Sequence, residues 1–335
     1  MNQPALPAEF LAHRYDPGHD AVHFVSAPRA LRRSVPFLTD ENLPSSAQPI
    51  VILRADALAS AVPPVRLNFI FHSAYCCSTL LANAYDRPGA AFSLKEPVLL
   101  NDMVGWRHRG AAPTALSAVL GDALRLLARP FDPGEIGVIK PSNVVNGLIP
   151  AIAAARPEAG ILLLHAPLKV YLGSIASKGL WGRRWVRDLL AKQLADDIVQ
   201  LGFDQPDYFL QTDLQVAAIG WLAQHALFVQ IARRWPDRVR TLDSETLLAD
   251  PPSALAALDQ LFGAEATPAM REAIVAEVFR RHAKSGSDFS VAHRAAGQES
   301  AAALHGEEID LVLRWIQAVA DGAGIGMELP APLLG

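Results

Sequence analysis

The stretch Leu67-Asn-Phe-Ile-Phe-His-Ser-Ala-Tyr-Cys-Cys-Ser-Thr-Leu-Leu-Ala82 decides the fold of this 335-residue chain. It begins with an apolar run typical of a buried strand, continues as a short polar loop, and starts a helix at Ser78-Thr79. A strand, a tight loop and a helix start bring backbone N–H groups together, as in loops that hold phosphate. The usual glycine and lysine are absent, so Ser78 and Thr79 are expected to supply the donors.

Short apolar runs alternate with longer helical stretches after this point. The pattern predicts, in chain order, strand 67–71, helix 78–85, strand 91–94, helix 113–128, strand 136–140, helix 144–155, strand 160–165, helix 168–178 and strand 239–242. The remaining C-terminal part is expected to be helical over 183–232, with a break near 203–206, and over 252–262, 268–281 and 307–322. Such alternation indicates an α/β fold of three layers, a mostly parallel sheet flanked by helices.

The chain is expected to divide into three parts. Residues 1–65 form an N-terminal elaboration packed on the main domain, with a short helix-like start, a strand at 21–25 and an apolar run at 50–53. Residues 66–325 form the main α/β domain, and 326–335 form a loose C-terminal tail.

Composition limits the classes of function. Hydrophobic residues make up 51% of the chain, enough for a large core. The formal charge of −4 gives no overall basic field, so nucleic acid and anionic membrane are not expected partners. We find no apolar run near the ~20 residues of a membrane span and no signal-peptide pattern, so a cytoplasmic location is expected.

The two cysteines are adjacent in the loop. Neighbouring cysteines rarely form a disulfide because their Cβ vectors diverge, so Cys76 and Cys77 are expected to be reduced and packed as small apolar residues under the loop. No other Cys or His spacing completes a metal site, and no metal is expected.

A late segment, Val239 to Gly263, combines a strand, an acidic-leucine turn, a helix start at Asp250-Pro251 and a helix end at Phe262-Gly263. With three earlier segments in matching order, it resembles the sulfotransferase family. The resemblance implies a P-loop-type fold and transfer of a sulfuryl group from 3′-phosphoadenosine 5′-phosphosulfate to the hydroxyl of a small-molecule or peptide acceptor.

The family's loop commonly reads Pro-Arg/Lys-Ser-Gly-Thr-Thr. Aligned on Ser78-Thr79, the basic residue becomes Tyr75, the serine Cys76 and the glycine Cys77. Cysteine at the glycine position predicts either a negative φ or backbone strain at Cys77. The missing basic residue removes a contact of ~1.5–3 kcal/mol to the sulfate or bridging phosphate, unless another cation replaces it.

A second segment covers 138–167 and resembles the part of the family that leads to a 3′-phosphate contact. The family usually shows Arg-Asp-Pro there, with a serine eight residues past the arginine. This chain has His165-Ala-Pro167, with Gly173 at that offset and Ser174 one residue further. The resemblance implies contacts to the 3′-phosphate from His165 and Ser174, with Ser177 as a further candidate.

The segment Phe92-Ser-Leu-Lys-Glu-Pro-Val98 resembles a short strand that presents a Lys-Glu or Glu-Pro pair at the active site. Because ligands of parallel sheets bind at the carboxyl ends of strands, we predict Glu96 as the general base. The alternative is that Glu96 merely pairs with Lys95 or caps a neighbour.

Two lysines are candidates for the missing cation. Lys140 ends a predicted strand in a chain poor in lysine, and Lys284 lies in Arg280-Arg-His-Ala-Lys-Ser-Gly286, which resembles a late basic loop of the family. His72 precedes the phosphate loop and is a candidate general base or a candidate hydrogen-bond donor to phosphate. The alternative is a residue at the end of a strand whose hydrogen bonds are only structural.

The leading hypothesis is therefore a sulfotransferase-like transferase. Two others are an ATP- or GTP-dependent kinase and a non-catalytic binding module of the same fold. Against the kinase hypothesis, the chain lacks the P-loop lysine, and Asp243 is the one weak candidate for a Mg²⁺ ligand. The Trp181-to-Arg187 cluster either stacks on a base or covers the core as a surface helix.

Overall fold

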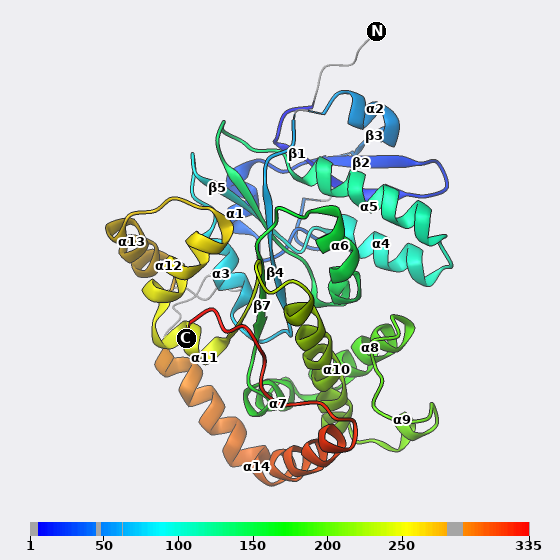
Figure 1. The fold of residues 1–335 in the computed structure, drawn as a ribbon, viewed down its shortest axis with the longest axis vertical. Coiled ribbons are helices and arrows are strands. Elements are labelled where there is room, and N and C mark those ends of the chain that lie inside the picture. Colours follow the sequence, from blue (N-terminus) through cyan, green and yellow to red (C-terminus); the bar gives the residue numbers. More distant parts are fainter. Residues whose placement is uncertain (1–5, 45–47, 62, 280–290, 335) are drawn as a thin grey trace.

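The chain forms two β-sheets in a computed structural model that describes residues 6–44, 48–61, 63–279 and 291–334. The main sheet has five parallel strands in the order β5-β6-β4-β7-β8 (Figure 1). Their bounds are β4 Leu67–His72, β5 Ala91–Lys95, β6 Ile136–Lys140, β7 Ile161–His165 and β8 Val239–Asp243. A smaller antiparallel sheet holds β1 Phe10–Asp16, β2 Ala21–Ser26 and β3 Ile50–Leu53.

The helices surround the main sheet. In chain order they are α1 Arg29–Ser34, α2 Arg54–Ala59, α3 Ser78–Ala84, α4 Val98–His108, α5 Pro113–Leu127, the 3-10 helix η1 Asn143–Leu148, α6 Ile149–Ala155, α7 Leu168–Ala176, α8 Gly179–Ala195, α9 Asp207–Leu210, α10 Asp213–Arg234, α11 Ser244–Ala249, α12 Pro251–Phe262, α13 Pro268–Val278 and α14 Val291–Gly322.

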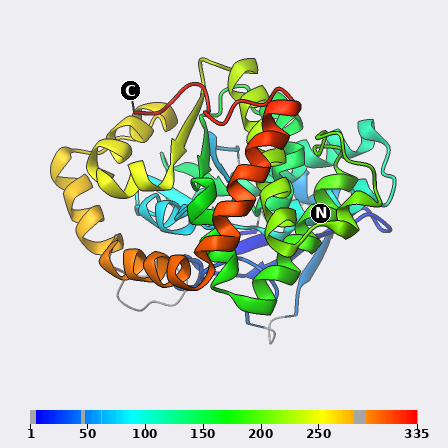
Figure 2. The same cartoon turned by 90° about the horizontal axis from the view of Figure 1, so that it is seen from below.

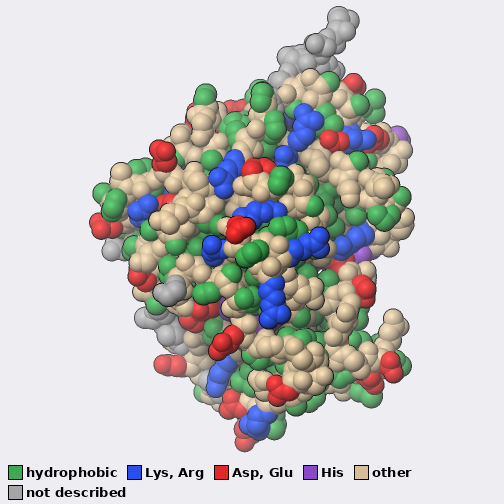
Figure 3. Space-filling model, viewed as in Figure 1, with side chains coloured by type: hydrophobic (Ala, Val, Ile, Leu, Met, Phe, Trp, Pro, Cys, Tyr) green, Lys and Arg blue, Asp and Glu red, His purple; other side chains and the backbone are tan. Residues whose placement is uncertain are grey.

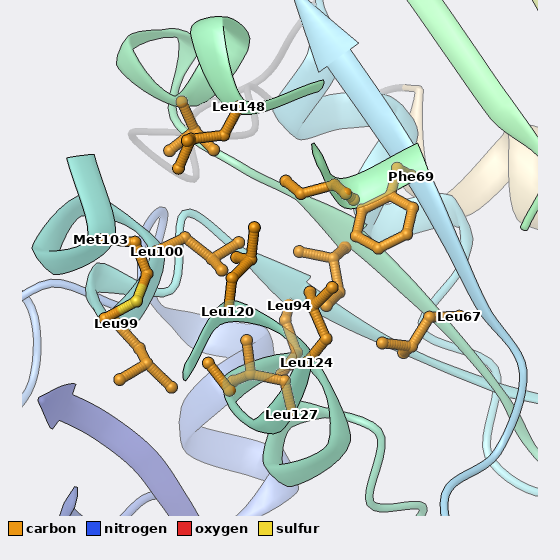
Figure 4. Close-up of a cluster of buried hydrophobic side chains, with 14 of the residues drawn as sticks. Leu67, Phe69, Leu94, Leu99, Leu100, Met103, Leu120, Leu124, Leu127 and Leu148 are labelled. Carbon is orange, nitrogen blue, oxygen red and sulfur yellow. The ribbon is translucent and has the colours of Figure 1, made fainter. Parts of the chain in front are cut away.

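The central strand β4 is buried on both faces and separates two cores. Phe69 and Phe71 pack with α4, α5, α6 and the small sheet, while Ile70 packs on the opposite face with α3, α7, α11, α12 and α14. Figure 4 shows Leu67 and Phe69 near leucines of α5. Burial of both faces explains the continuous apolar runs of these strands. The predicted three-layer α/β fold is confirmed.

Helix α10 runs through both cores. Within the described residues it is the one helix long and apolar enough to cross a membrane, yet 78% of its apolar window is buried inside the protein. The same composition is expected of a helix in a protein core.

The surface carries charges of both signs. On the face of Figure 1, Lys and Arg side chains lie in a band across the middle, with acidic side chains among and beside them (Figure 3). This mixture agrees with the small net charge of the chain.

Several boundaries differ from the sequence-based expectations. The expected helix-like start contains strand β1, because residues 10–16 pair with β2. Helix α14 begins at Val291 rather than at 307, and it crosses the side seen in Figure 2. The segment 280–286, which resembles a late basic loop, lies outside the described residues.

The C-terminal segment docks on the main sheet, so the expectation of a loose tail was wrong. The Thr241 N–H donates to the Ala331 carbonyl (2.9 Å), and the Leu333 N–H donates to the Thr241 carbonyl (2.8 Å). Strand β8 is the edge of the sheet, and its unpaired backbone groups give this segment its partners.

Candidate functional site

The loop after β4 lies where the chain changes direction across the sheet. From β4 the chain builds β5 and β6 on one side, then crosses to β7 and β8 on the other. Ligands of open parallel sheets bind outside the carboxyl ends of the strands at such a switch point. The loop 73–77 is therefore at the position where a ligand is expected.

The loop keeps a left-handed backbone without glycine. The φ angles of Ala74, Tyr75 and Cys77 are 73°, 53° and 62°. Of the two alternatives at Cys77, the negative φ is wrong and the strained backbone is what the structure has. Each such residue costs roughly 1–3 kcal/mol and persists where its surroundings fix it, which is common at functional sites.

Hydrogen bonds to the neighbouring strand hold this loop. The Ser73 N–H donates to the Leu164 carbonyl (3.1 Å), and the Ser73 hydroxyl accepts from the Ala166 N–H (3.1 Å). Leu164 and Ala166 flank the end of β7. The strained loop is thus fastened to the strand beside it.

The hydrogen bonds of His72 position the loop and leave its ring poorly placed to act as a base. Its Nδ1 accepts from the Ala74 N–H and its Nε2 lies 3.0 Å from the Pro141 carbonyl, which requires an Nε2–H donor. With both ring nitrogens in these bonds, the imidazole is neutral and fixed. His72 therefore ties the loop to the end of β6, in agreement with the alternative of a satisfied strand-end residue.

Glu96 and Lys140 meet at the carboxyl ends of adjacent strands. The Lys140 ammonium forms an ion pair with Glu96 Oε1, and the Glu96 N–H donates to the Lys140 carbonyl at 2.7 Å. The Lys140 side chain is 1% exposed and that of Glu96 is 17% exposed. Removing either partner would leave the other charge largely buried and unpaired, which typically costs about 3–5 kcal/mol.

The expected alternative, a Lys95–Glu96 pair, does not form. Lys95 points elsewhere and donates to Asn83 Oδ1 (2.9 Å) and to the Arg33 carbonyl (3.2 Å). Burial lowers the pKa of Lys95 to about 8. Glu96 follows the end of β5 with a φ of 52°, so its side chain does not follow the alternation of the strand that places Lys95.

Lys140 is close enough to the loop to act on it electrostatically. Burial raises the pKa of the Cys76 thiol, and the positive charge of Lys140 opposes that rise. Cys76 is fully buried, with its Sγ 3.5 Å from the Leu164 carbonyl. Its packing under the loop agrees with the expectation for a small apolar residue.

Arg294 of α14 is a cation of the site that the sequence did not reveal. Its Nη1 lies 3.4 Å from Cys77 Sγ, and its Nη2 donates to Glu245 Oε1 (2.6 Å) and to the Ser244 hydroxyl (3.3 Å). Its Nε is buried and has no hydrogen-bond partner within the described residues. The guanidinium thus contacts the loop at Cys77, the residue before α3.

Tyr75 begins a row of aromatic rings. It contacts Tyr171 and Trp185 at centroid distances of 6.0 and 5.6 Å, and Trp185 stacks on Trp181 at 6.4 Å. Burial raises the pKa of Tyr75 to about 12, so its phenol is neutral. The Lys178 ammonium lies 5.9 Å from its ring. Trp181 is 62% exposed, so the row runs from the loop to the surface.

Ser78 and Thr79 begin α3 as expected, and both are buried. The serines expected at the 3′-phosphate are used differently. The Ser174 hydroxyl donates to the Val170 carbonyl and that of Ser177 to the Gly173 carbonyl, both at 2.8 Å within their own helical turn.

His165 lines a separate cavity, and burial lowers its pKa. A neutral imidazole there is a weak partner for phosphate. In this structure, neither His165 nor Ser174 therefore offers a positive charge for the predicted contact to a 3′-phosphate. Lys284, the other candidate cation, lies outside the described residues, and within them no group of His, Cys, Asp and Glu is arranged to hold a metal ion.

Comparison with known proteins gives distant structural matches. A sulfotransferase domain from the curacin biosynthetic pathway aligns with 81% of this chain and 100% of its own, at 16% identity and a TM-score of 0.43. The sulfotransferase STF9 from Mycobacterium avium aligns with 75% of this chain and 77% of its own, at 12% identity and a TM-score of 0.41. No protein-family model and no curated protein matches the sequence.

Proposed function

We propose that this protein is a cytoplasmic sulfotransferase-like transferase that uses 3′-phosphoadenosine 5′-phosphosulfate and modifies a hydroxyl of a small molecule or peptide. The observation that carries the proposal is the Lys140–Glu96 ion pair at the carboxyl ends of β6 and β5, beside the loop at the switch point. In such a transfer a carboxylate can take the proton of the acceptor, and a cation can stabilise the charge that develops on the leaving group.

The roles follow from the chemistry of the transfer. The acceptor oxygen forms a bond to sulfur as the bond from sulfur to the bridging phosphate oxygen breaks. Glu96 takes the acceptor proton, and the charge that develops on the leaving phosphate is met by Lys140. Lys140 pairs with Glu96 in this structure. When the donor binds, Lys140 exchanges Glu96 for the phosphate of the donor.

Arg294 supplies the second cation in this proposal. Its Nη1 reaches Cys77, and its buried Nε has no partner within the described residues. Guanidinium groups bind phosphate and sulfate through charge-assisted hydrogen bonds, each typically worth ~1.5–3 kcal/mol. Arg294 therefore replaces the basic residue absent at Tyr75.

The geometry of Asp243 counts against a kinase. Its carboxylate caps α11, accepting from the N–H groups of Glu245 (2.8 Å) and Thr246 (2.9 Å) and from the Thr246 hydroxyl. These bonds make Asp243 the N-cap of α11, a structural role that accounts for an acidic residue at this position without a bound Mg²⁺.

The nucleotide preference tests the proposal. We expect adenosine 3′,5′-bisphosphate to raise the free energy of unfolding by about 2.7 kcal/mol at 100 times its dissociation constant. ATP and GTP at equal concentration, each with and without Mg²⁺, are expected to stabilise less. Thermal denaturation measures this directly. A preference for ATP with Mg²⁺ would support the kinase, and no response to any nucleotide would refute both enzymatic functions.

A further inference from the structure

A cavity whose lining does not include the Lys140–Glu96 pair lies at the carboxyl ends of β7 and β8, on the other side of β4 from β5 and β6. It has a volume of about 490 Å³ and opens between the ends of β7 and β8, helix α10 and the C-terminal segment. Ligand pockets commonly have volumes of this order. The bonds of Ala331 and Leu333 to Thr241 hold the C-terminal segment in place as one wall.

Two imidazoles line this cavity, and buried nitrogens of both have no hydrogen-bond partner within the described residues. His225 is 2% exposed, and neither of its ring nitrogens has a partner within the described residues; the same holds for Nδ1 of His165. The backbone of Gly326 and Met327 lies near His225, but neither makes a well-oriented bond. Buried polar atoms without partners are rare in native proteins, and a ligand in the cavity would satisfy them.

The wall beside His225 is aromatic. Trp221 stacks on His225 with ring centroids 4.6 Å apart, and the two histidine rings meet edge to face at 6.0 Å. Burial lowers the pKa of His225 to about 4, so its ring is neutral at pH 7. A flat aromatic ligand matches these rings in shape, and a ligand N–H can bond to an imidazole nitrogen.

The charge of the lining selects against anions. Asp243 and Glu328 both line the cavity, and none of its described lining residues is Lys or Arg. Burial opposes ionisation of Asp243, but hydrogen bonds from Thr246 and Glu245 outweigh it and hold the pKa of Asp243 below its usual value. Two carboxylates without a compensating cation favour a positively charged ligand.

We propose that this cavity binds a small aromatic amine, with its ring beside Trp221 and His225 and its ammonium group toward Asp243 and Glu328. Its lining includes neither Glu96 nor Lys140, so the site is distinct from the proposed transfer site and does not rest on the proposed function. The two sites are nevertheless close. Ala166 accepts from Trp221 Nε1 (2.9 Å) and donates to Ser73 of the phosphate loop.

Tryptamine is a suitable probe, with indole-3-acetate as a comparable anion. In calorimetric titrations of the full chain at pH 7.5, we expect tryptamine to bind at least tenfold more tightly than indole-3-acetate. His225→Phe keeps the ring but removes both nitrogens, and should weaken tryptamine binding at least tenfold. His23→Phe, a change on β2, should leave it unchanged. Equal affinity for both probes, or no binding of tryptamine at millimolar concentration, would overturn the proposal.

Glu328→Gln keeps the test decisive if His225→Phe fails to fold, because Glu328 is exposed. It should reduce the preference for tryptamine over indole-3-acetate at least threefold, and an unchanged preference would count against the assigned ammonium position. Tryptamine and adenosine 3′,5′-bisphosphate should bind at the same time. Strict competition between them would show that the cavity is part of the nucleotide site and would refute a separate amine site.

Discussion

Replacing Glu96 by glutamine should lower the rate of sulfuryl transfer about 10²- to 10⁴-fold, the range typical for loss of a general base. Glutamine is nearly isosteric and still accepts a hydrogen bond from Lys140, so the loop and the fold should be preserved. Donor binding should change much less than turnover, because the carboxylate acts on the acceptor proton.

The measurement is release of adenosine 3′,5′-bisphosphate from the donor, with a hydroxyl compound that the wild-type protein modifies in a panel of phenols, alcohols and tyrosine peptides. Glu158→Gln is a matched control, because Glu158 is exposed on the loop between α6 and β7. A Glu96→Gln protein as active as the control would exclude Glu96 as the base.

Replacing Asp259 by alanine should lower the free energy of unfolding by about 3–5 kcal/mol. Asp259 is 2% exposed and accepts from Arg87 Nη1 (3.0 Å), the Tyr85 hydroxyl (3.2 Å) and Arg271 Nε (2.8 Å). These bonds connect α12 with the end of α3 and with α13. Alanine leaves the guanidinium of Arg87 buried and without its carboxylate, which is the source of the large cost.

Urea denaturation of the two proteins measures this difference. The surface pair of Lys169 and Asp310, with side chains 62% and 52% exposed, provides the control. Asp310→Ala should cost no more than about 1 kcal/mol, as is usual for exposed ion pairs. If Asp259→Ala cost as little as Asp310→Ala, the buried network would not stabilise the layer that carries α3.

The sequence predicted the main sheet well because its strands are buried on both faces. The expected and observed bounds of β6 coincide, and those of β7 and β8 differ by one residue at one end. Strand β1 was missed because its residues, FLAHRYD, mix apolar and charged side chains and depend on β2 for their pairing. Docking of the C-terminal segment was missed because it depends on the free edge of β8, a property of the assembled sheet.

Part of the candidate site was predictable from the order of the predicted strands. Glu96 and Lys140 follow or end neighbouring parallel strands, so topology brings them to one edge. Arg294 is 217 residues from Cys77 in sequence, and nothing in the residues around it indicates that contact. The direction of His165 was also not predictable, because the end of a strand can face either side of the sheet.

The central claim is that a loop without its own basic residue binds the nucleotide because α14 supplies a cation. Calorimetric titration of adenosine 3′,5′-bisphosphate into three proteins, wild type, Arg294→Met and Arg240→Met, tests it most directly. Arg240 is the control because its guanidinium donates to the Val239 carbonyl (2.8 Å), away from the loop.

Loss of a charged hydrogen bond worth ~1.5–3 kcal/mol corresponds to weakening of binding by roughly 10- to 150-fold. We therefore expect Arg294→Met to bind at least tenfold more weakly than wild type, and Arg240→Met to match wild type. A wild-type protein that does not bind the nucleotide, or an Arg294→Met protein that binds it as tightly as wild type, would contradict the account.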